Sequence, residues 1–326
     1  MSLNPTRRAI LSALPLGLAA SAIRPVAAQS WPNRPIRFIS PWPPGGPADL
    51  ISRPLSDRLT QTLGQPFITE NRPGGGGMIA TALAARAAPD GYTVLFSQAS
   101  PSVISPNFQA VSYDTQKDFA PVTQLVSSGL VFVVRPGIEA RTVPELVELA
   151  KRAKPELTFG SIGPASTTHL AGELLMLKSS VKLLHVPYTG STQPITDMLA
   201  GRLDMGFWNV GAVMPFIQSG QLRPLAVTSA KRSSRLPELP AMAEFYPGFE
   251  VNSWYGVMVP SATPQLIIDR LYQAFIEALK QPENVARLKE NGLEIEGTTP
   301  DQFRQKIVDD LKLWQGVAQA TGIRVT

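Results

Sequence analysis

The feature that most constrains the fold is an alternation of short apolar segments with amphipathic ones, beginning at Pro35. The apolar segments predict strands and the amphipathic segments predict helices. Short β-loop-α units of this kind are typical of parallel sheets covered by helices on both faces, so the fold class is α/β. The predicted strands are 35–41, 67–70, 93–97, 121–126, 131–134, 157–160, 181–186, 203–208, 225–228 and 254–259, and the predicted helices are 48–63, 79–88, 142–154, 169–178, 193–200 and 212–218, followed by a mostly helical tail over 264–326.

Composition limits the classes of protein that fit this pattern. The chain has 326 residues, 44% of them hydrophobic, which is enough for two lobes with separate cores. There is no cysteine, which excludes disulfides, thiolate catalysis and cysteine metal sites. The formal charge of +5 owes much to Arg7, Arg8 and Arg24, and the remaining 27 basic side chains nearly balance 25 acidic ones. Without a basic run carrying interleaved aromatics, we expect no nucleic-acid partner.

Residues 1–28 are predicted to be a signal peptide. Arg7 and Arg8 precede the small apolar segment 9–23, and the segment Val-Ala-Ala ends at Ala28 with small residues suited to cleavage before Gln29. The apolar run is short for a membrane span. The residues around Arg7 resemble a twin-arginine signal, and ordinary Sec export remains an alternative. We therefore expect a periplasmic mature chain of about 298 residues.

Motifs that carry catalysis or cofactors are missing from the sequence. It contains no His-Glu-x-x-His, no Gly-x-Ser-x-Gly and no nucleotide P-loop. The segment 75–80 fits Gly-x-Gly-x-x-Ala, but the next strand ends without the acid that would hold a ribose, so we interpret these glycines as a close-packed loop. With only two histidines, no nucleophile–base pair is visible. We predict no cofactor, no metal and no enzymatic activity.

Loops of a different character join several strands to helices. They cover 42–49, 97–102, 161–168 and 188–191, and combine glycine, proline, small hydroxyls and aromatics. A helix N-terminus presents free N–H groups and a partial positive charge, so it attracts a carboxylate, and proline keeps the loop ordered before binding. The sequence therefore predicts a binding site for a small anion. The candidate ligand-binding residues are Trp42, Pro44, Gly45, Gly46, Asp49, Gln98, Ser100, Ser161, Gly163, Ser166, Thr167, Thr168, Tyr188, Trp208 and Asn209.

Two interpretations stay open for the tryptophans. Trp42 and Trp208 lie at predicted strand ends, where two indoles on opposite sides of a cleft would form a dry wall. Either indole would equally serve as core packing.

Structural interpretations also compete at the polar candidates. Asp49 fits a helix cap, and 166–168 combine caps with an anion site. Tyr188 either lines or buttresses the cleft. His169 suits a structural donor, and His185, inside a strand, suits the core.

Six motifs, taken together, resemble the Bug family of extracytoplasmic solute receptors of tripartite tricarboxylate transporters. The resemblance runs from about Trp31 to the C-terminus. The motifs are PWPPGGPAD at 41–49, ENRPGGGG at 70–77, APDGYT at 88–93, HVPY at 185–188, GRLD at 201–204 and LAVTS at 225–229.

The resemblance implies a two-lobed, type II periplasmic-binding-protein architecture with crossing strands at the hinge. Lobe 1 would comprise 29–129 and 256–326, and lobe 2 would comprise 130–255. In this family small carboxylates are usually held by backbone N–H groups and bridging waters, in loops matching 42–49 and 161–168. The implied partners are membrane transporter subunits or a sensor.

The chain departs from the family pattern at three places. Trp42 replaces a usual Phe, Trp208 replaces a frequent Asp, and Thr189 replaces a frequent Lys. These departures favour a less polar, aromatic carboxylate. Pro54 inside the first helix predicts a kink. The alternative function is an exported enzyme that acts on a carboxylate with the same fold.

Overall fold

The computed structural model describes residues 31–42, 47–188, 190–233 and 235–324. Met1–Trp31 and Pro32–Thr326 are separate units, and every described helix and strand belongs to the second. The predicted signal peptide lies outside the described residues. None of the helices in the described ranges is long and apolar enough to cross a membrane.

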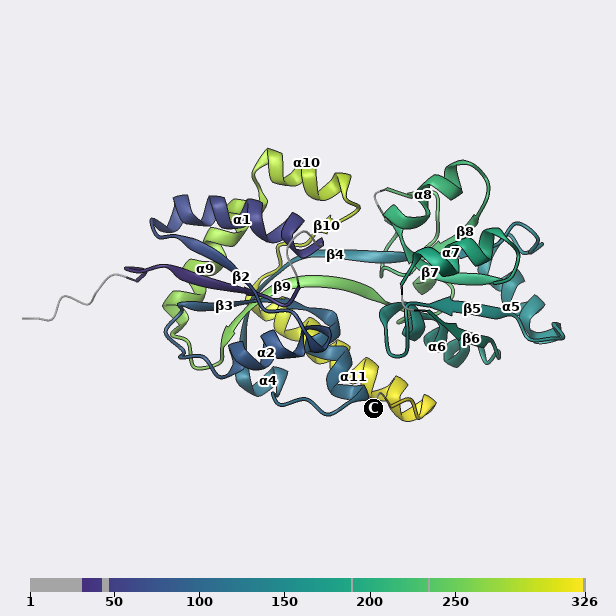
Figure 1. Ribbon diagram of the computed structural model, residues 1–326, viewed down its shortest axis with the longest axis horizontal. Coiled ribbons are helices and arrows are strands. Elements are labelled where there is room, and N and C mark those ends of the chain that lie inside the picture. Colours follow the sequence, from purple (N-terminus) through teal and green to yellow (C-terminus); the bar gives the residue numbers. More distant parts are fainter. Residues whose placement is uncertain (1–30, 43–46, 189, 234, 325–326) are drawn as a thin grey trace, which may run out of the picture. The chain divides into compact units, whose positions relative to one another are not determined.

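The first half of the sheet is built from parallel βαβ units. Strand β1 (Ile36–Ser40) lies between β2 (Phe67–Asn71) and β3 (Thr93–Gln98) and runs parallel to both. Helix α1 (Pro47–Leu63) connects β1 to β2, and α2 (Met78–Ala85) connects β2 to β3 (Figure 1). The predicted alternation is confirmed here, and α1 continues through Pro54 as one helix.

The second half repeats this arrangement. Strand β5 (Thr158–Ser161) runs parallel to β6 (Leu184–Pro187) and to β7 (Met205–Asn209). Helix α6 (Thr167–Ser179) follows β5, and α7 (Thr192–Leu199) follows β6. The carboxyl ends of these strands therefore share one edge, where the loops meet the helix starts.

Two long strands join the halves and run antiparallel to their neighbours. Strand β4 (Phe119–Val134) pairs with β9 (Asn252–Pro260) as far as Gly129, and from Leu130 onwards it pairs with β7. The prediction of two strands over 121–134 was wrong, because β9 extends the backbone across the Ser-Ser-Gly segment that reads as a break. The sheet is therefore mixed, and its order is β2-β1-β3-β9-β4-β7-β5-β6, with β8 and β10 also paired to β4.

The remaining elements cover the sheet or connect its strands (Figure 1). They are η1 (Gly75–Gly77), the π-helix η2 (Ser100–Ile104), α3 (Ser105–Phe108), α4 (Thr115–Asp118), α5 (Val143–Arg152), α8 (Val210–Gln218), β8 (Arg223–Val227), η3 (Met242–Glu244), α9 (Gln265–Leu279), α10 (Pro282–Glu290), β10 (Glu294–Ile295) and α11 (Pro300–Thr321).

Local signals explain where several helices begin and end. Gly64 follows α1 in the left-handed region, with φ +69°, which glycine adopts without strain. Thr142 caps α5 by accepting from the N–H of Glu145 at 3.3 Å. Glu145 does not complete a reciprocal capping box, because its carboxylate accepts from the N–H of Arg141 rather than from that of Thr142.

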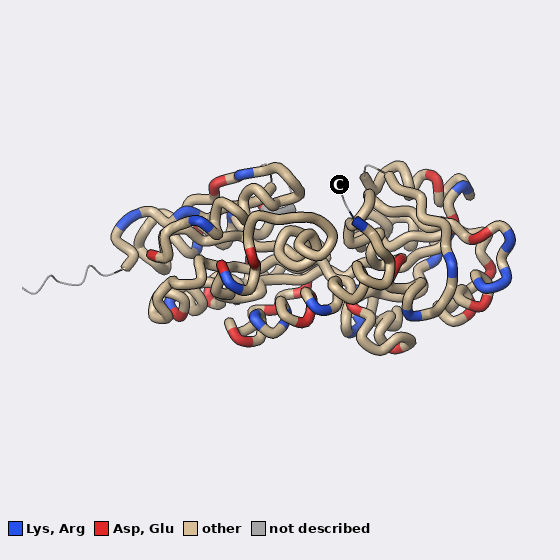
Figure 2. The backbone as a smooth tube through the Cα atoms, turned by 90° about the horizontal axis from the view of Figure 1, so that it is seen from below, with Lys and Arg blue, Asp and Glu red and all other residues tan. Residues whose placement is uncertain are grey.

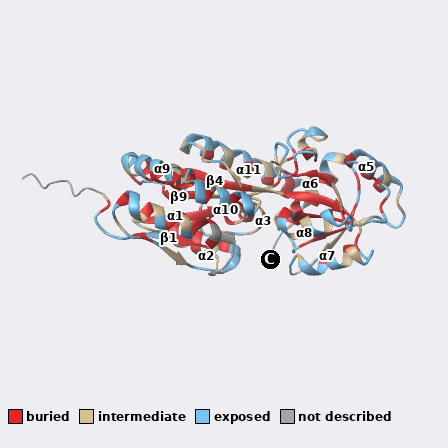
Figure 3. Ribbon diagram, turned by 90° about the horizontal axis from the view of Figure 1, so that it is seen from above, coloured by how far each residue is buried: buried red, intermediate tan, exposed pale blue. Residues whose placement is uncertain are grey.

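Burial concentrates on the joining strands and on the helix faces that cover the sheet (Figure 3). All but two residues of β4, Ser128 and Gly129, are buried. Its Phe132 stacks on Phe207 with ring centroids 4.2 Å apart. Charged side chains of both signs are interspersed along the described chain (Figure 2). The polar groups that remain at the strand ends are therefore the natural place to look for function.

Candidate functional site

The carboxyl end of β1 supplies the first group of predicted residues. Trp42 is half-buried, and its carbonyl accepts from the side-chain amide of Asn71 at 2.7 Å. Its indole Nε1 is buried without a hydrogen-bond partner among the described residues. The predicted residues Pro44, Gly45 and Gly46 lie outside the described ranges. No described residue therefore uses this donor, and the nitrogen itself is closed to solvent.

Three further predicted residues lie near the same edge. Asp49, in the first turn of α1, is buried and pairs with Arg53, with Oδ2 and Nε 3.0 Å apart. This contact agrees with a structural role for Asp49. Gln98 is buried at the end of β3, and Ser100 begins η2 and is half-buried. These three side chains at the edge are therefore polar, and each of them is buried or half-buried.

The loop between β5 and α6 is a dense hydrogen-bond network. The N–H of Gly163 donates to the Ser161 hydroxyl at 3.0 Å, and the Ser166 hydroxyl donates to the Gly163 carbonyl at 2.6 Å. Thr168 accepts from the N–H of Ile162 at 2.9 Å, and Ser166 caps α6 by accepting from the third helical residue. The structure therefore brings four of the predicted residues, Ser161, Gly163, Ser166 and Thr168, together in one loop.

Two N–H groups of this loop make no such bond. The backbone N–H groups of Thr167 and Thr168, the first two residues of α6, have no hydrogen-bond partner in the described parts of the chain. The loop 161–168 carries no Lys, Arg, Asp or Glu. Its attraction for an anion therefore comes from the helix start itself, and α6 is 13 residues long.

Tyr188 and Asn209 lie at the ends of β6 and β7. The N–H of Tyr188 donates to the Ser161 carbonyl at 3.0 Å, so Tyr188 adjoins the loop. Its hydroxyl donates to Asp197 at 2.8 Å, and burial together with this carboxylate raises the pKa of Tyr188 to about 12. The geometry favours the buttress interpretation. Asn209 is exposed and makes no side-chain cap to α8.

Trp208 requires a correction. Its side chain is 1% exposed, and its Nε1 donates to the sulfur of Met198 at 3.3 Å. A Cβ added at Gly206 would lie only 2.4 Å from that nitrogen, so the indole fills space left by glycine. The structure contradicts the expected exposed indole wall and removes Trp208 from the candidate ligand contacts.

The two histidines lie directly beneath the loop. The rings of His169 and His185 stack, with centroids 3.9 Å apart. The Nδ1 of His169 accepts from the N–H of Ala165 at 3.0 Å, and its Nε2 lies 3.2 Å from the Glu173 carboxylate, so both ring nitrogens have structural partners. Glu173 lies four residues after His169 on the same face of α6, whereas the contact with Ala165 depends on the shape of the loop before the helix.

His185 also forms a pair that the sequence did not reveal. Its Nε2 lies 2.7 Å from the Ser161 hydroxyl, the geometry of a nucleophile and a base. However, Ser161 is fully buried and its hydroxyl is bonded to Gly163. Burial and the nearby His169 lower the pKa of His185 to about 4. No hydrogen bond in the described residues joins a carboxylate to His185, so the pair lacks the group that orients a base.

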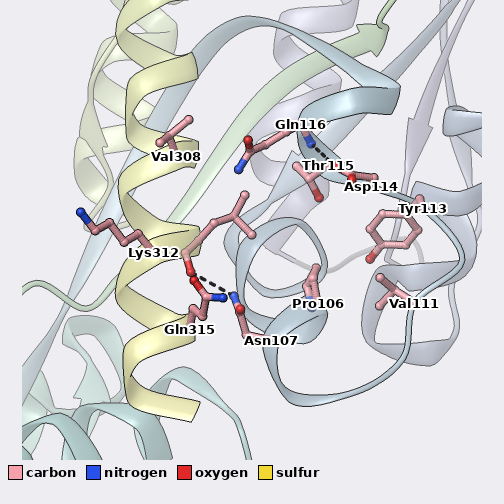
Figure 4. Close-up of a pocket in the computed structure, with 11 residues that line it drawn as sticks. Pro106, Asn107, Val111, Tyr113, Asp114, Thr115, Gln116, Val308, Lys312 and Gln315 are labelled. Carbon is pink, nitrogen blue, oxygen red and sulfur yellow. Dashed lines mark hydrogen bonds between the residues drawn. The ribbon is translucent and has the colours of Figure 1, made fainter. Parts of the chain in front are cut away.

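A separate cavity of about 440 Å³ lies between α11 and the segment from α3 to α4 (Figure 4). Three of its polar residues already have partners within the protein: Asn107 donates to the Leu311 carbonyl, Tyr113 donates to the Pro101 carbonyl, and Asp114 caps α4. This cavity contains none of the predicted ligand residues. For that reason it is a weaker candidate than the loop edge.

Strand ends that meet helix N–H groups at the edge of a mixed sheet are typical of α/β proteins that bind a small ligand there. The family model for the tripartite tricarboxylate transporter family receptor matches residues 51–323, and the chain belongs to this family. Protein BugT of Bordetella pertussis is 35% identical over 327 residues, covering 99% of this chain and 100% of that protein. In the residues that the structure describes, no group of three or more His, Cys, Asp or Glu side chains is arranged to hold a metal.

Solved structures agree in fold. R. palustris Rpa4515 with adipate has a TM-score of 0.72 and 31% identity, covering 90% of this chain and 99% of that one. MatC from Rhodopseudomonas palustris with bound malate has a TM-score of 0.69 and 26% identity, covering 88% and 99%. The Bug-family resemblance and the predicted fold class are thereby confirmed.

Proposed function

We propose that this protein is a periplasmic receptor that binds a small organic carboxylate and delivers it to a membrane transporter, without catalysing a reaction. The observation that carries the proposal is a pair of backbone N–H groups, at Thr167 and Thr168, that have no hydrogen-bond partner among the described residues. They lie at the end of a loop without charged side chains. Such a site suits a carboxylate, because it offers donors and a partial positive charge together. Family membership supports the receptor role.

The ligand is most consistent with an aliphatic dicarboxylate. The relatives solved with adipate and malate hold such acids. The expectation of an aromatic acid rested on two indoles and on Thr189 in place of a frequent Lys, and burial of Trp208 leaves Trp42 as the one partly exposed indole of the two. Trp42 then offers one partly exposed apolar surface, rather than half of a sandwich.

The lobe boundaries remain part of the proposal: lobe 1 as 29–129 with 256–326, and lobe 2 as 130–255. The strands β4 and β9 connect the two proposed lobes, and a hinge there would let ligand shift the protein towards a closed form. Small-angle scattering of the mature chain should then give a smaller radius of gyration with ligand than without. An unchanged radius in a protein shown to be open beforehand would contradict hinge closure.

The deciding experiment is calorimetric titration of the mature chain with malate, adipate, succinate, citrate and benzoate. We expect binding of at least one aliphatic dicarboxylate and weaker binding of benzoate. Recovery of the ligand unchanged and in stoichiometric amount supports a receptor, whereas turnover supports the exported-enzyme alternative. If none of these carboxylates binds, the proposed class of ligand is wrong.

A further inference from the structure

The shape of the loop 161–166 depends on side chains that no ligand needs to touch. Gly163 has φ +124° and Ala165 has φ +54°, and the second value is unfavourable for a residue with a Cβ. A short loop with two such residues holds its shape only if its neighbours fix it. The hydrogen bonds of Ala165 and Ser161 identify the neighbours that fix the loop.

His169 fixes the Ala165 end. Its Nδ1 must be unprotonated to accept from the N–H of Ala165, at 3.0 Å. Its Nε2 then carries the proton and faces the Glu173 carboxylate, 3.2 Å away. Glu173 is largely buried, with 14% of its side chain exposed, and selects this tautomer by accepting from Nε2.

His185 fixes the Ser161 end. Its Nε2 lies 2.7 Å from the Ser161 hydroxyl, which also accepts from the N–H of Gly163. The imidazole contacts the rings of Phe159, with centroids 4.9 Å apart, and His169, with centroids 3.9 Å apart. One stacked pair of imidazoles thus reaches both ends of the loop.

We propose that His169 and His185 are positioning residues, which hold the loop in the shape that leaves the N–H groups of Thr167 and Thr168 free for a ligand. The role rests on the proposed function, because it concerns the loop that binds the carboxylate. If the Ala165 bond is lost, its left-handed backbone has no compensation, and the start of α6 loses its fixed direction. Affinity then falls although no ligand contact has been removed.

The first test needs no ligand. The chain has only two histidines, so ¹⁵N imidazole spectra of the mature chain report on this pair alone. At pH 7.5 we expect His169 as the Nε2–H tautomer and a slowly exchanging Ala165 amide. His169→Phe keeps a stacked ring but removes the acceptor, so exchange at Ala165 should become about tenfold faster. His169→Asn restores an acceptor near the position of Nδ1 and should restore slow exchange.

An Nδ1–H tautomer, or equal exchange of Ala165 in wild type and His169→Phe, would overturn the proposal. His185→Phe provides the matched variant at the other end, since it keeps the stack and removes the bond to Ser161. Circular dichroism first confirms that each variant is folded.

The second test uses malate and adipate as probes. For whichever acid binds wild type, His169→Phe should weaken binding about tenfold, and His169→Asn should recover most of the loss. Equal affinity in all three proteins would overturn the positioning role while leaving the receptor function intact. If neither acid binds wild type, that result counts against the proposed ligand, and the imidazole and amide measurements still decide the role of the histidines.

Discussion

The indole N–H of Trp208 donates to the sulfur of Met198, with the two atoms 3.3 Å apart inside the second half of the protein. Both side chains belong to one buried cluster beneath α7 and α8. Trp208 therefore belongs to the core, and its effect on ligand binding should be indirect.

Replacing Trp208 with alanine should destabilise the fold by about 3–5 kcal/mol, the range for deleting a large buried aromatic side chain. Trp42→Ala, at a half-buried position, should cost clearly less. Urea unfolding of both variants measures the difference. If Trp208→Ala were as stable as wild type yet bound no carboxylate, the core assignment would fail.

The parts of the fold that could be predicted are those that local signals in the sequence specify. Helix ends were accurate where glycine terminates the pattern, as at Gly64, because that signal is contained in the sequence itself. The joining strand β4 was predicted as two pieces, because its continuity through Gly129 depends on pairing with Asn252, more than a hundred residues away. Strand β6 was predicted to begin at Val181 but begins at Leu184. No local pattern encodes these partners.

The candidate site was predictable in location but not in contacts. Serine and threonine before a helix identified the loop 161–168, since capping chemistry is local. The direction in which Trp208 points was not predictable, because a residue at a strand end can face either side of the sheet. The glycines that leave room for the indole, Gly160 and Gly206, also lie on two different strands, β5 and β7. The pairing of His169 with His185 depends on the register between β5 and β6, which the sequence alone does not give.

The stability of the protein should depend on pH through His185. Burial and the nearby His169 lower its pKa from 6.5 to about 4 in the folded state. The unfolded chain takes up this proton below pH 6.5 and the folded chain does not, so the contribution is complete above pH 6.5 and is lost as pH falls to about 4. Urea unfolding between pH 7.5 and pH 4 should show this loss in wild type and a flatter profile in His185→Gln.

A control for this profile is available at Glu244. Arg232 and the N–H of Ala241 lower the pKa of Glu244 from 4.5 to about 2. Its contribution is therefore complete above pH 4.5 and is lost only as pH falls towards 2. Glu244→Gln should leave the slope between pH 6.5 and pH 4.5 unchanged. A flattened slope in that interval would assign the effect to a group other than His185.

The charge of Lys306 should be important for stability. Its Nζ lies 2.8 Å from Glu250 and 2.9 Å from Asp310, and Asp310 accepts from the Trp254 indole at 2.8 Å. Burial lowers the pKa of Lys306, but the two carboxylates raise it overall. Lys306→Met leaves two carboxylates facing each other with little solvent.

We expect Lys306→Met to cost about 2–4 kcal/mol, slightly below the range for fully buried pairs. The reduction allows for the lysine side chain's 21% exposure. Adding Asp310→Asn should recover part of the loss, since an amide oxygen still accepts from Trp254. Denaturant unfolding of the single and double variants measures this coupling. Additive losses in the two variants would show that the charges act independently.

The N–H of Thr167 offers the sharpest test of how the ligand is held. Proline is well tolerated at the first position of a helix, and Ser166 before it already has φ −72° and ψ 159°, which a following proline favours. Thr167→Pro therefore deletes one donor while α6 keeps its start. Thr167→Ala deletes the hydroxyl and keeps the N–H.

With a bound carboxylate, Thr167→Pro should lose about 1.5–3 kcal/mol of binding free energy, the scale of a hydrogen bond to a charged group, and Thr167→Ala should lose less than about 1 kcal/mol. Calorimetry with the tightest-binding acid of the panel gives both values. Equal affinities for Thr167→Pro and wild type, with unchanged melting behaviour, would place the carboxylate away from the start of α6, because no other change in the variant compensates for a missing donor.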